Sequence, residues 1–186
     1  MKLGYALTGS FCTVSRSLII LQSLAAENDI TPIISTAILT TDTRFGKAED
    51  TIRHLTELCG KGPISTVKNA EPLGPKQPLD ALIVCPCTGN TLAKLACGIT
   101  DTSVTMAVKA HLRCDRPLVL AISTNDALSQ NLKNLATMLQ RKSVYVVPFS
   151  QDDPINKPHS LISDFSLVGA TLEAAMKGEQ LQPLLR

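Results

Sequence analysis

The stretch from residue 80 to residue 98 constrains the fold of this chain more than any other segment. It contains a short apolar run, Leu82 to Val84, which is typical of a buried strand. Pro86 is expected to end this strand, because proline has no backbone N–H to donate. A polar turn follows at residues 88–90, and residues 91–96 then predict a helix that ends at a glycine. The stretch therefore predicts a buried strand, a turn and a helix in direct succession.

The turn between this strand and this helix has the features of an anion-binding site. The first N–H groups of a helix have no partner within the helix. Together with the helix dipole and nearby hydroxyls, these groups suit a phosphate. An ordinary strand-to-helix turn has the same pattern, so this turn alone leaves both interpretations open. A second turn of the same kind, Thr8-Gly9-Ser10, favours the phosphate-binding interpretation.

Apolar runs and helical periodicities alternate along the rest of the chain. Further strands are expected at residues 3–8, 30–34, 64–67, 118–122 and 144–147, with helical spacing starting at residues 14, 52, 128 and 168. Pro32 is expected to interrupt the second strand, and residues 149–160 to form a polar loop. The alternation predicts one α/β domain over residues 1–186, a doubly wound and mostly parallel sheet with helices on both faces.

The doubly wound fold also predicts where a ligand binds. In such sheets the ligand lies beyond the carboxyl ends of the strands, where the strand order reverses. We expect the first strand and the strand at residues 82–84 to lie side by side at this point. That arrangement would bring the Gly9–Ser10 turn and the Thr88–Thr91 turn to one crevice.

Composition excludes several classes of partner. A net charge of +2 implies no polyanionic partner, and 3% aromatic residues without tryptophan disfavour stacking on single-stranded nucleic acid. No apolar run is long enough to span a bilayer, so no membrane partner is expected. The six cysteines match neither a zinc ribbon nor a disulfide framework, which favours a reducing cytoplasm and no metal. Cys85 and Cys87 are expected to pack beside the strand end.

The first turn favours a mononucleotide over a dinucleotide. It contains the single Gly9, and Phe11 stands where a dinucleotide fingerprint requires a second glycine. The chain alone is therefore not expected to bind NADP tightly, and the absence of a Gly-Lys-Ser/Thr motif gives no support to an NTPase. A ligand with one phosphate fits better. The side chains that are candidates to hydrogen-bond its oxygens are Ser10, Ser35, Thr88, Asn90 and Thr91.

Residues 86–101, PCTGNTLAKLACGITD, resemble the P-A-T-A-N-T-x-A-K-x-A-x-G-x-A-D signature of the flavoproteins that bind flavin mononucleotide (FMN). That family contains cysteine decarboxylases and flavin prenyltransferases. Thr8-Gly9-Ser10 resembles its first nucleotide loop, and Ser35 resembles the serine after its second strand. The resemblance implies a Rossmann-like flavoprotein fold with FMN as cofactor. The residues that it implies for FMN binding are Gly9, Ser10, Phe11, Ser35, Thr88, Gly89, Asn90, Thr91 and Asn125.

Four further segments resemble one group within that family: residues 6–13, 41–48, 121–126 and 147–154. Members of this group form one part of a two-component oxidoreductase that oxidises a dihydropyridine dicarboxylate with NADP. The resemblance implies the cytoplasm of the mother cell of a sporulating bacterium. It also implies a second component that carries the dinucleotide-binding domain, in agreement with the missing fingerprint here. Homo-oligomers, either trimers or dodecamers, are implied as well.

The chain departs from the family pattern at two positions. The decarboxylases use a histidine about eight residues before the aspartate that corresponds to Asp80, and Pro72 stands there instead. Their P-A-M-N substrate clamp corresponds to residues 122–125 and keeps only Asn125. Three functions stay open: catalysis as one component of an oxidoreductase, a non-catalytic scaffold role within it, and flavin-dependent decarboxylation, which Pro72 disfavours.

The implied reaction suggests candidate catalytic residues. Oxidation of a dihydropyridine ring removes a hydride and a proton, and two carboxylates on the substrate require cationic or N–H partners. Arg44, in the loop at residues 40–46, is the first candidate, with a solvated loop arginine as the equal alternative. Asn125 is the second candidate, with a helix N-cap as its alternative. His111, beside Lys109 and Arg113, is expected at the surface or at an interface rather than in catalysis.

Overall fold

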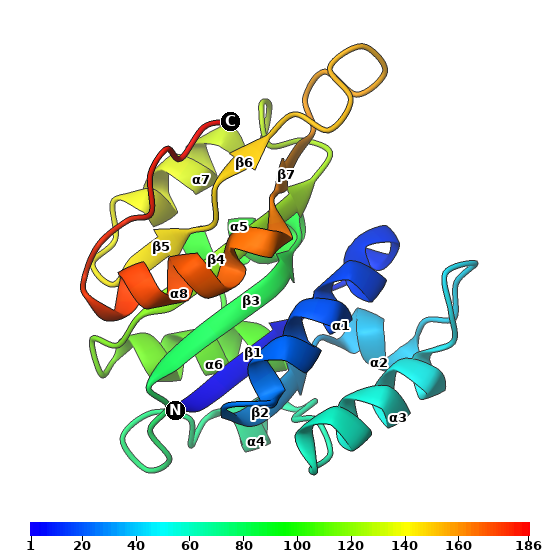
Figure 1. The fold of residues 1–186 in the computed structure, drawn as a ribbon, viewed down its shortest axis with the longest axis vertical. Helices are drawn as coiled ribbons and strands as arrows, with labels where there is room; N and C mark the ends of the chain where they lie inside the picture. The colour runs from blue at the N-terminus through cyan, green and yellow to red at the C-terminus, as the bar shows by residue number, and fades with distance from the viewer.

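A seven-stranded sheet runs through the centre of the molecule (Figure 1), in a computed structural model that describes residues 1–186. Five strands are parallel, in the order β2-β1-β3-β4-β5, and β7 and β6 continue the sheet antiparallel beyond the end of β4. The strands are β1 (Lys2–Leu7), β2 (Asp29–Ile34), β3 (Ala81–Cys87), β4 (Leu118–Thr124), β5 (Val144–Val146), β6 (Phe149–Ser150) and β7 (Leu161–Ser163). The predicted fold class, a doubly wound and mostly parallel sheet, is confirmed.

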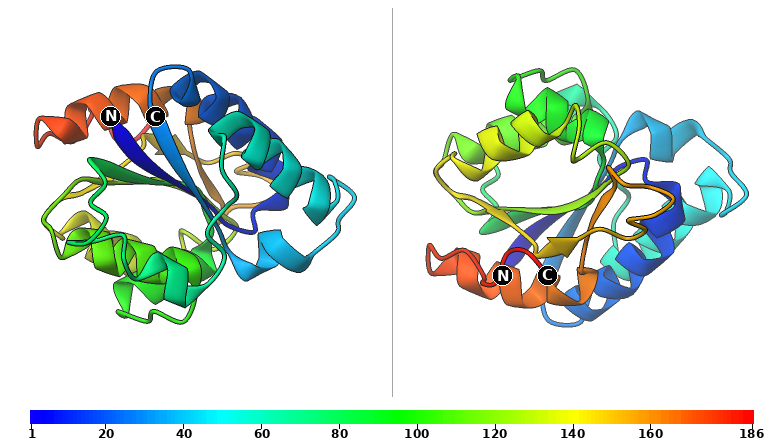
Figure 2. Two further views of the ribbon diagram at one scale, coloured as in Figure 1. Left: turned by 90° about the horizontal axis from the view of Figure 1, so that it is seen from below. Right: turned by 90° about the horizontal axis from the view of Figure 1, so that it is seen from above.

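Helices cover both faces of the sheet (Figure 2). One core contains residues of α1 (Phe11–Ala25), α2 (Thr36–Thr40), α3 (Ala48–Cys59) and α8 (Val168–Met176), with the short 3₁₀ helix Phe165–Leu167. The opposite core contains residues of α4 (Val67–Ala70), α5 (Gly89–Ala96), α6 (Ser103–Leu112) and α7 (Leu132–Leu139). In β3, Leu82 and Val84 enter one core and Ile83 enters the other, because successive side chains of a strand point to opposite faces.

The predicted neighbourhood of the first strand and the strand at residues 82–84 is confirmed. Strand β1 pairs in parallel with β2 on one side and with β3 on the other. The helix after β1, α1, packs on one face of the sheet, and the helix after β3, α5, packs on the other. The strand order thus reverses between β1 and β3, which separates the two connections and places a crevice at the carboxyl edge of the sheet.

Two expectations about proline are wrong. Strand β3 continues through Pro86 to Cys87, because its register with β4 shifts between Val84 and Cys87 and this irregularity accommodates a residue without an N–H. Strand β2 continues through Pro32, because β2 lies at the edge of the sheet, where a missing donor is tolerated.

Several elements differ from the sequence-based expectation. Residues 64–67 contribute one isolated bridge, between Ile64 and Ile33, rather than a strand. The helix α6 was not predicted, and the expected loop at residues 149–160 begins with β6 and ends directly before β7. Leu128 precedes α7, which begins only at Leu132. His111 is buried at the end of α6, not at the surface, and its Nε2 lies 2.9 Å from the carbonyl oxygen of Pro117.

Candidate functional site

A cavity of about 410 Å³ opens at the carboxyl edge of the sheet. Its volume lies within the range of about 300–1,000 Å³ that is typical of sites for small ligands and cofactors. Its walls come from the turn after β1, the loop between α2 and α3, the start of α5, the end of β4 and the segment that leads into β7. The predicted site residues that line it are Gly9, Ser10, Phe11, Arg44, Thr88, Gly89 and Asn125.

The N-terminus of α1 lies at this cavity and is left open. Ser10 is the N-cap residue, but its side chain accepts no hydrogen bond from the helix backbone, and the first turn contains no acidic residue. The Ser10 hydroxyl instead lies 2.8 Å from the Ser123 hydroxyl and accepts a 3.0 Å hydrogen bond from the Thr13 hydroxyl. The N–H of Thr13 donates to the Ser10 carbonyl at 2.9 Å, but those of Phe11 and Cys12 remain available to an anion, and the helix dipole favours one there.

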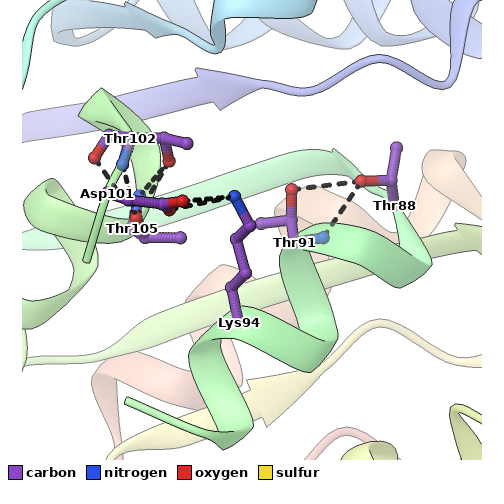
Figure 3. Close-up of polar contacts among 6 residues, drawn as sticks. All are labelled: Thr88, Thr91, Lys94, Asp101, Thr102 and Thr105. Atoms are coloured by element: carbon purple, nitrogen blue, oxygen red, sulfur yellow. Dashed lines mark hydrogen bonds and ion pairs between the residues drawn. The ribbon is translucent and has the colours of Figure 1, made fainter. Parts of the chain in front are cut away.

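The turn before α5 is tied to the turn after β1. The N–H of Thr88 donates to the Thr8 hydroxyl at 3.0 Å, and that hydroxyl donates to the Pro86 carbonyl at 2.7 Å. Thr88 also caps α5, since its hydroxyl oxygen accepts from the N–H of Thr91 at 3.3 Å (Figure 3). These bonds hold the two turns of the crevice at fixed positions relative to each other.

A cluster of polar side chains, Thr124, Asp126 and Asn131, packs against the backbone of Gly89. The Asp126 carboxylate accepts hydrogen bonds from the Thr124 hydroxyl at 2.5 Å and from the Asn131 amide at 2.9 Å to each oxygen. The Asn131 amide oxygen in turn accepts from the Asn134 amide at 2.9 Å. A Cβ at position 89 would lie only 2.6 Å from an Asp126 oxygen, so this close approach requires glycine.

The sequence did not predict this cluster, because its side chains come together only where the segments after β4 and before α7 pack against α5. The two asparagines were its only signal: Asn131 and Asn134 are buried polar residues three positions apart in a leucine-rich stripe.

Three residues of the predicted FMN set lie outside the cavity lining. Ser35 follows β2 and caps α2, with its hydroxyl oxygen 3.5 Å from the N–H of Ile38. Its own N–H donates to the carbonyl of Leu7 at 3.0 Å, so Ser35 lies at the same edge of the sheet. Thr91 is buried and accepts from the Thr88 hydroxyl, and Asn90 is exposed.

Asn125 lies in the turn after β4 and lines the cavity. The alternative interpretation of Asn125 as a helix N-cap is wrong, because α7 begins at Leu132 and its N-cap position is Asn131.

Two other residues of the signature, Lys94 and Asp101, have a structural role. Lys94 donates to both carboxylate oxygens of Asp101, at 2.9 and 2.7 Å (Figure 3), and these bonds hold the pKa of Asp101 below its usual value. The next residue, Thr102, forms a capping box with Thr105 at the start of α6. Lys94 and Asp101 therefore connect α5 to α6 and do not line the cavity.

The buried cysteines are poor nucleophiles. Burial raises the pKa of Cys85 to about 11 and that of Cys87 to about 12, so both thiols stay protonated near neutral pH. Both pack within β3, as expected. No group of three His, Cys, Asp or Glu side chains is placed to hold a metal ion, and none of the helices has the length and hydropathy needed to cross a membrane.

Comparisons with known proteins agree on one family. The family model described as Flavoprotein matches residues 1–171. The B subunit of dipicolinate synthase from Bacillus subtilis (strain 168) is 41% identical over 185 residues, which cover 99% of this chain and 92% of that protein.

Two solved structures extend the comparison. The crystal structure of the dipicolinate synthase B subunit from Bacillus halodurans C has a TM-score of 0.91 at 39% identity, and the match covers 100% of this chain and 95% of that one. A dodecameric FMN-dependent Ubix-like decarboxylase from Escherichia coli O157:H7 has a TM-score of 0.62 at 25% identity, with 80% and 79% of the two chains covered.

Proposed function

The chain belongs to the flavoprotein family, as its signature predicted, and we propose that it binds FMN in the cavity at the carboxyl edge of the sheet. The open N-terminus of α1 is the observation that carries this proposal. A phosphate there would accept hydrogen bonds from the N–H groups of Phe11 and Cys12 and from Ser10. Bound flavin would supply a hydride acceptor.

The remaining cavity residues fit the body of the cofactor. Phe11 offers an apolar face, while Thr88, Gly89 and Asn125 line the same cavity. Gly9 has no room for a larger side chain without crowding, since a Cβ there would lie 3.1 Å from that of Ala37. We keep the predicted residues that lie outside the lining as supporting residues of the proposed site, because they stabilise the turns around it: Ser35, Asn90 and Thr91.

We further propose that the chain is the B subunit of a dipicolinate synthase. In the proposed reaction dihydrodipicolinate loses a hydride and a proton, NADP⁺ becomes NADPH, and dipicolinate is released. Similarity to two proteins with that name supports this assignment. The chain lacks a dinucleotide fingerprint, so NADP would bind to the partner of this chain, the A subunit of the enzyme.

The assembly and its location form part of the same proposal. We propose a homo-oligomer, for which the dodecameric relative provides support. The proposed location is the cytoplasm of the mother cell during sporulation, in line with the Bacillus relatives.

An assay with both components tests the assignment. Dihydrodipicolinate and NADP are mixed with this chain, with the A subunit, or with both, and NADPH is followed by its absorbance. We expect NADPH only when both proteins are present. We also expect Thr88→Asp to lower the rate by about tenfold or more, because a carboxylate in the cavity repels an anionic ligand. Thr56→Asp, on the exposed face of α3, is the matched control and should leave the rate unchanged.

The outcomes separate the three candidate functions. Equal rates for wild type and Thr88→Asp, with no FMN retained by either, would favour a scaffold role. Release of carbon dioxide from a peptidyl cysteine, without NADPH formation, would favour a decarboxylase.

A further inference from the structure

The cavity contains two cationic side chains, and they come from different loops. Arg44 lies between α2 and α3, and Lys157 lies between β6 and β7. Both loops project beyond the carboxyl edge of the sheet, on either side of the first turn of α1 (Figures 1 and 2). The lining contains one acidic side chain, Asp152. The cavity as a whole therefore carries a positive charge that favours an anionic ligand.

The guanidinium group of Arg44 has no partner that satisfies its charge. It makes no ion pair and no hydrogen bond, and it lies over the ring of Phe45 at 4.8 Å from the centroid. This cation–π contact leaves the N–H donors of the guanidinium group free, which suits a bidentate contact with a carboxylate.

Lys157 is held by a carboxylate of the same loop. Its ammonium group donates to Asp152 at 2.9 Å, and the two side chains are 52% and 28% exposed. Partial burial by itself raises the pKa of Asp152, but the hydrogen bond from Lys157 opposes it, and the net pKa of Asp152 is lowered. The same ion pair raises the pKa of Lys157. An exposed pair of this kind is weak, so an incoming carboxylate can replace Asp152 at little cost.

Aromatic side chains line the same cavity. The chain contains four phenylalanines, and two of them, Phe11 and Phe45, line this cavity. A flat ring that carries two carboxylates has the complementary chemistry: its faces pack on apolar side chains and its anionic groups meet the cations.

We propose that Arg44 and Lys157 bind the two carboxylates of the dicarboxylate substrate, and that Asp152 holds Lys157 until the substrate displaces it. This inference rests on the proposed function, since it concerns substrate recognition in the same cavity. It assigns the flavin phosphate to the α1 terminus and Ser10, and the substrate carboxylates to the two loops.

Calorimetry with pyridine-2,6-dicarboxylate, the reaction product, tests the assignment on the full chain loaded with FMN. Arg44→Met and Lys157→Met should each weaken binding by about tenfold to a hundredfold, because each removes a charged hydrogen bond. Asp152→Asn should have the opposite effect and strengthen binding by up to about fivefold, because it releases Lys157. Pyridine-2-carboxylate has one carboxylate, so only one of the two Met variants should bind it more weakly than wild type does.

Another exposed ion pair provides the matched control. Lys142 donates to Asp115 at 2.7 Å, and neither residue lines the cavity. Lys142→Met and Asp115→Asn should leave dicarboxylate affinity unchanged. Weaker binding by Asp152→Asn, or unchanged binding by both Arg44→Met and Lys157→Met, would overturn the inference.

An FMN titration of the same variants separates the two anionic ligands. We expect FMN affinity to stay unchanged in Arg44→Met and Lys157→Met. If FMN affinity falls by the same factor as dicarboxylate affinity, the cations serve the flavin phosphate and the inference fails, although the proposed function stands. If wild type binds no dicarboxylate, with or without the A subunit, the inference fails together with the proposed reaction.

Discussion

Gly89 is fixed by the polar cluster behind it rather than by its own turn. Thr124, Asp126 and Asn131 occupy the space into which a Cβ would point, with the nearest Asp126 oxygen at 2.6 Å. The cluster cannot move away cheaply, because the Asp126 carboxylate would lose hydrogen bonds in a partly buried place. The first turn of α5 can therefore pack directly against the end of β4 only because position 89 carries no Cβ.

Gly89→Ala should consequently lower the free energy of unfolding, by about 1–3 kcal/mol, as overpacking typically does. Urea denaturation followed by circular dichroism measures it. Gly169→Ala, in α8, is the control: nothing lies within 4 Å of a Cβ there, and alanine should stabilise the helix by about 0.4–1 kcal/mol. Equal effects in the two variants would show that the cluster does not constrain position 89.

At the scale of elements, α6 is joined to β4 by a buried histidine. His111 lies at the end of α6, and its ring donates to the carbonyl of Pro117, directly before β4. Burial is the main cause that lowers the pKa of His111, and it outweighs the opposing hydrogen bond to Pro117. The neighbouring Arg116 lowers the pKa further. The folded protein thus favours the neutral ring.

This shift predicts that stability falls on acidification. The folded pKa lies below the unfolded value of 6.5, so the unfolded chain binds more protons as the pH falls through that value, and unfolding is favoured. The melting temperature should drop between about pH 7.5 and pH 5.5, and less steeply in His111→Gln. His54→Gln, exposed on α3, should follow wild type. A wild-type slope in His111→Gln would contradict this account.

For the whole molecule, sequence reasoning was strongest where periodicity and backbone chemistry act locally. The alternation of apolar runs and helical stripes predicted the parallel sheet and the contact between β1 and β3. The two-residue strand β6 and the three-residue strand β7 were missed, because segments this short have no measurable periodicity. The end of β3 was misplaced because the irregularity that accommodates Pro86 depends on β4.

In the site, too, local sequence patterns predicted some residues, while others depend on tertiary contacts. Gly9, Ser10, Thr88 and Gly89 were predicted from two turns, and the structure brings all four to one cavity. Lys157 and Asp152 in the cavity, and the Asp126 cluster that packs against Gly89, were not predicted. Each comes from a segment far along the chain from the two turns. Their place depends on tertiary contacts that no local pattern encodes.

The central claim, that the α1 terminus of this cavity holds the phosphate of FMN, is tested most directly by Ser10→Asp. Aspartate is a favourable N-cap residue, so α1 should stay folded while a carboxylate enters the phosphate position. Ser23→Asp, near the far end of α1 and exposed, adds the same charge away from the cavity.

Titration of the purified protein with FMN, followed by quenching of flavin fluorescence, measures the affinity of all three proteins. The loss of a charge-assisted hydrogen bond, about 1.5–3 kcal/mol, predicts that Ser10→Asp binds FMN about tenfold to a hundredfold more weakly than wild type, or weaker still once repulsion is added. Ser23→Asp should bind like wild type. Equal affinities for wild type and Ser10→Asp, with an unchanged circular dichroism spectrum, or no FMN uptake by wild type, would contradict the claim.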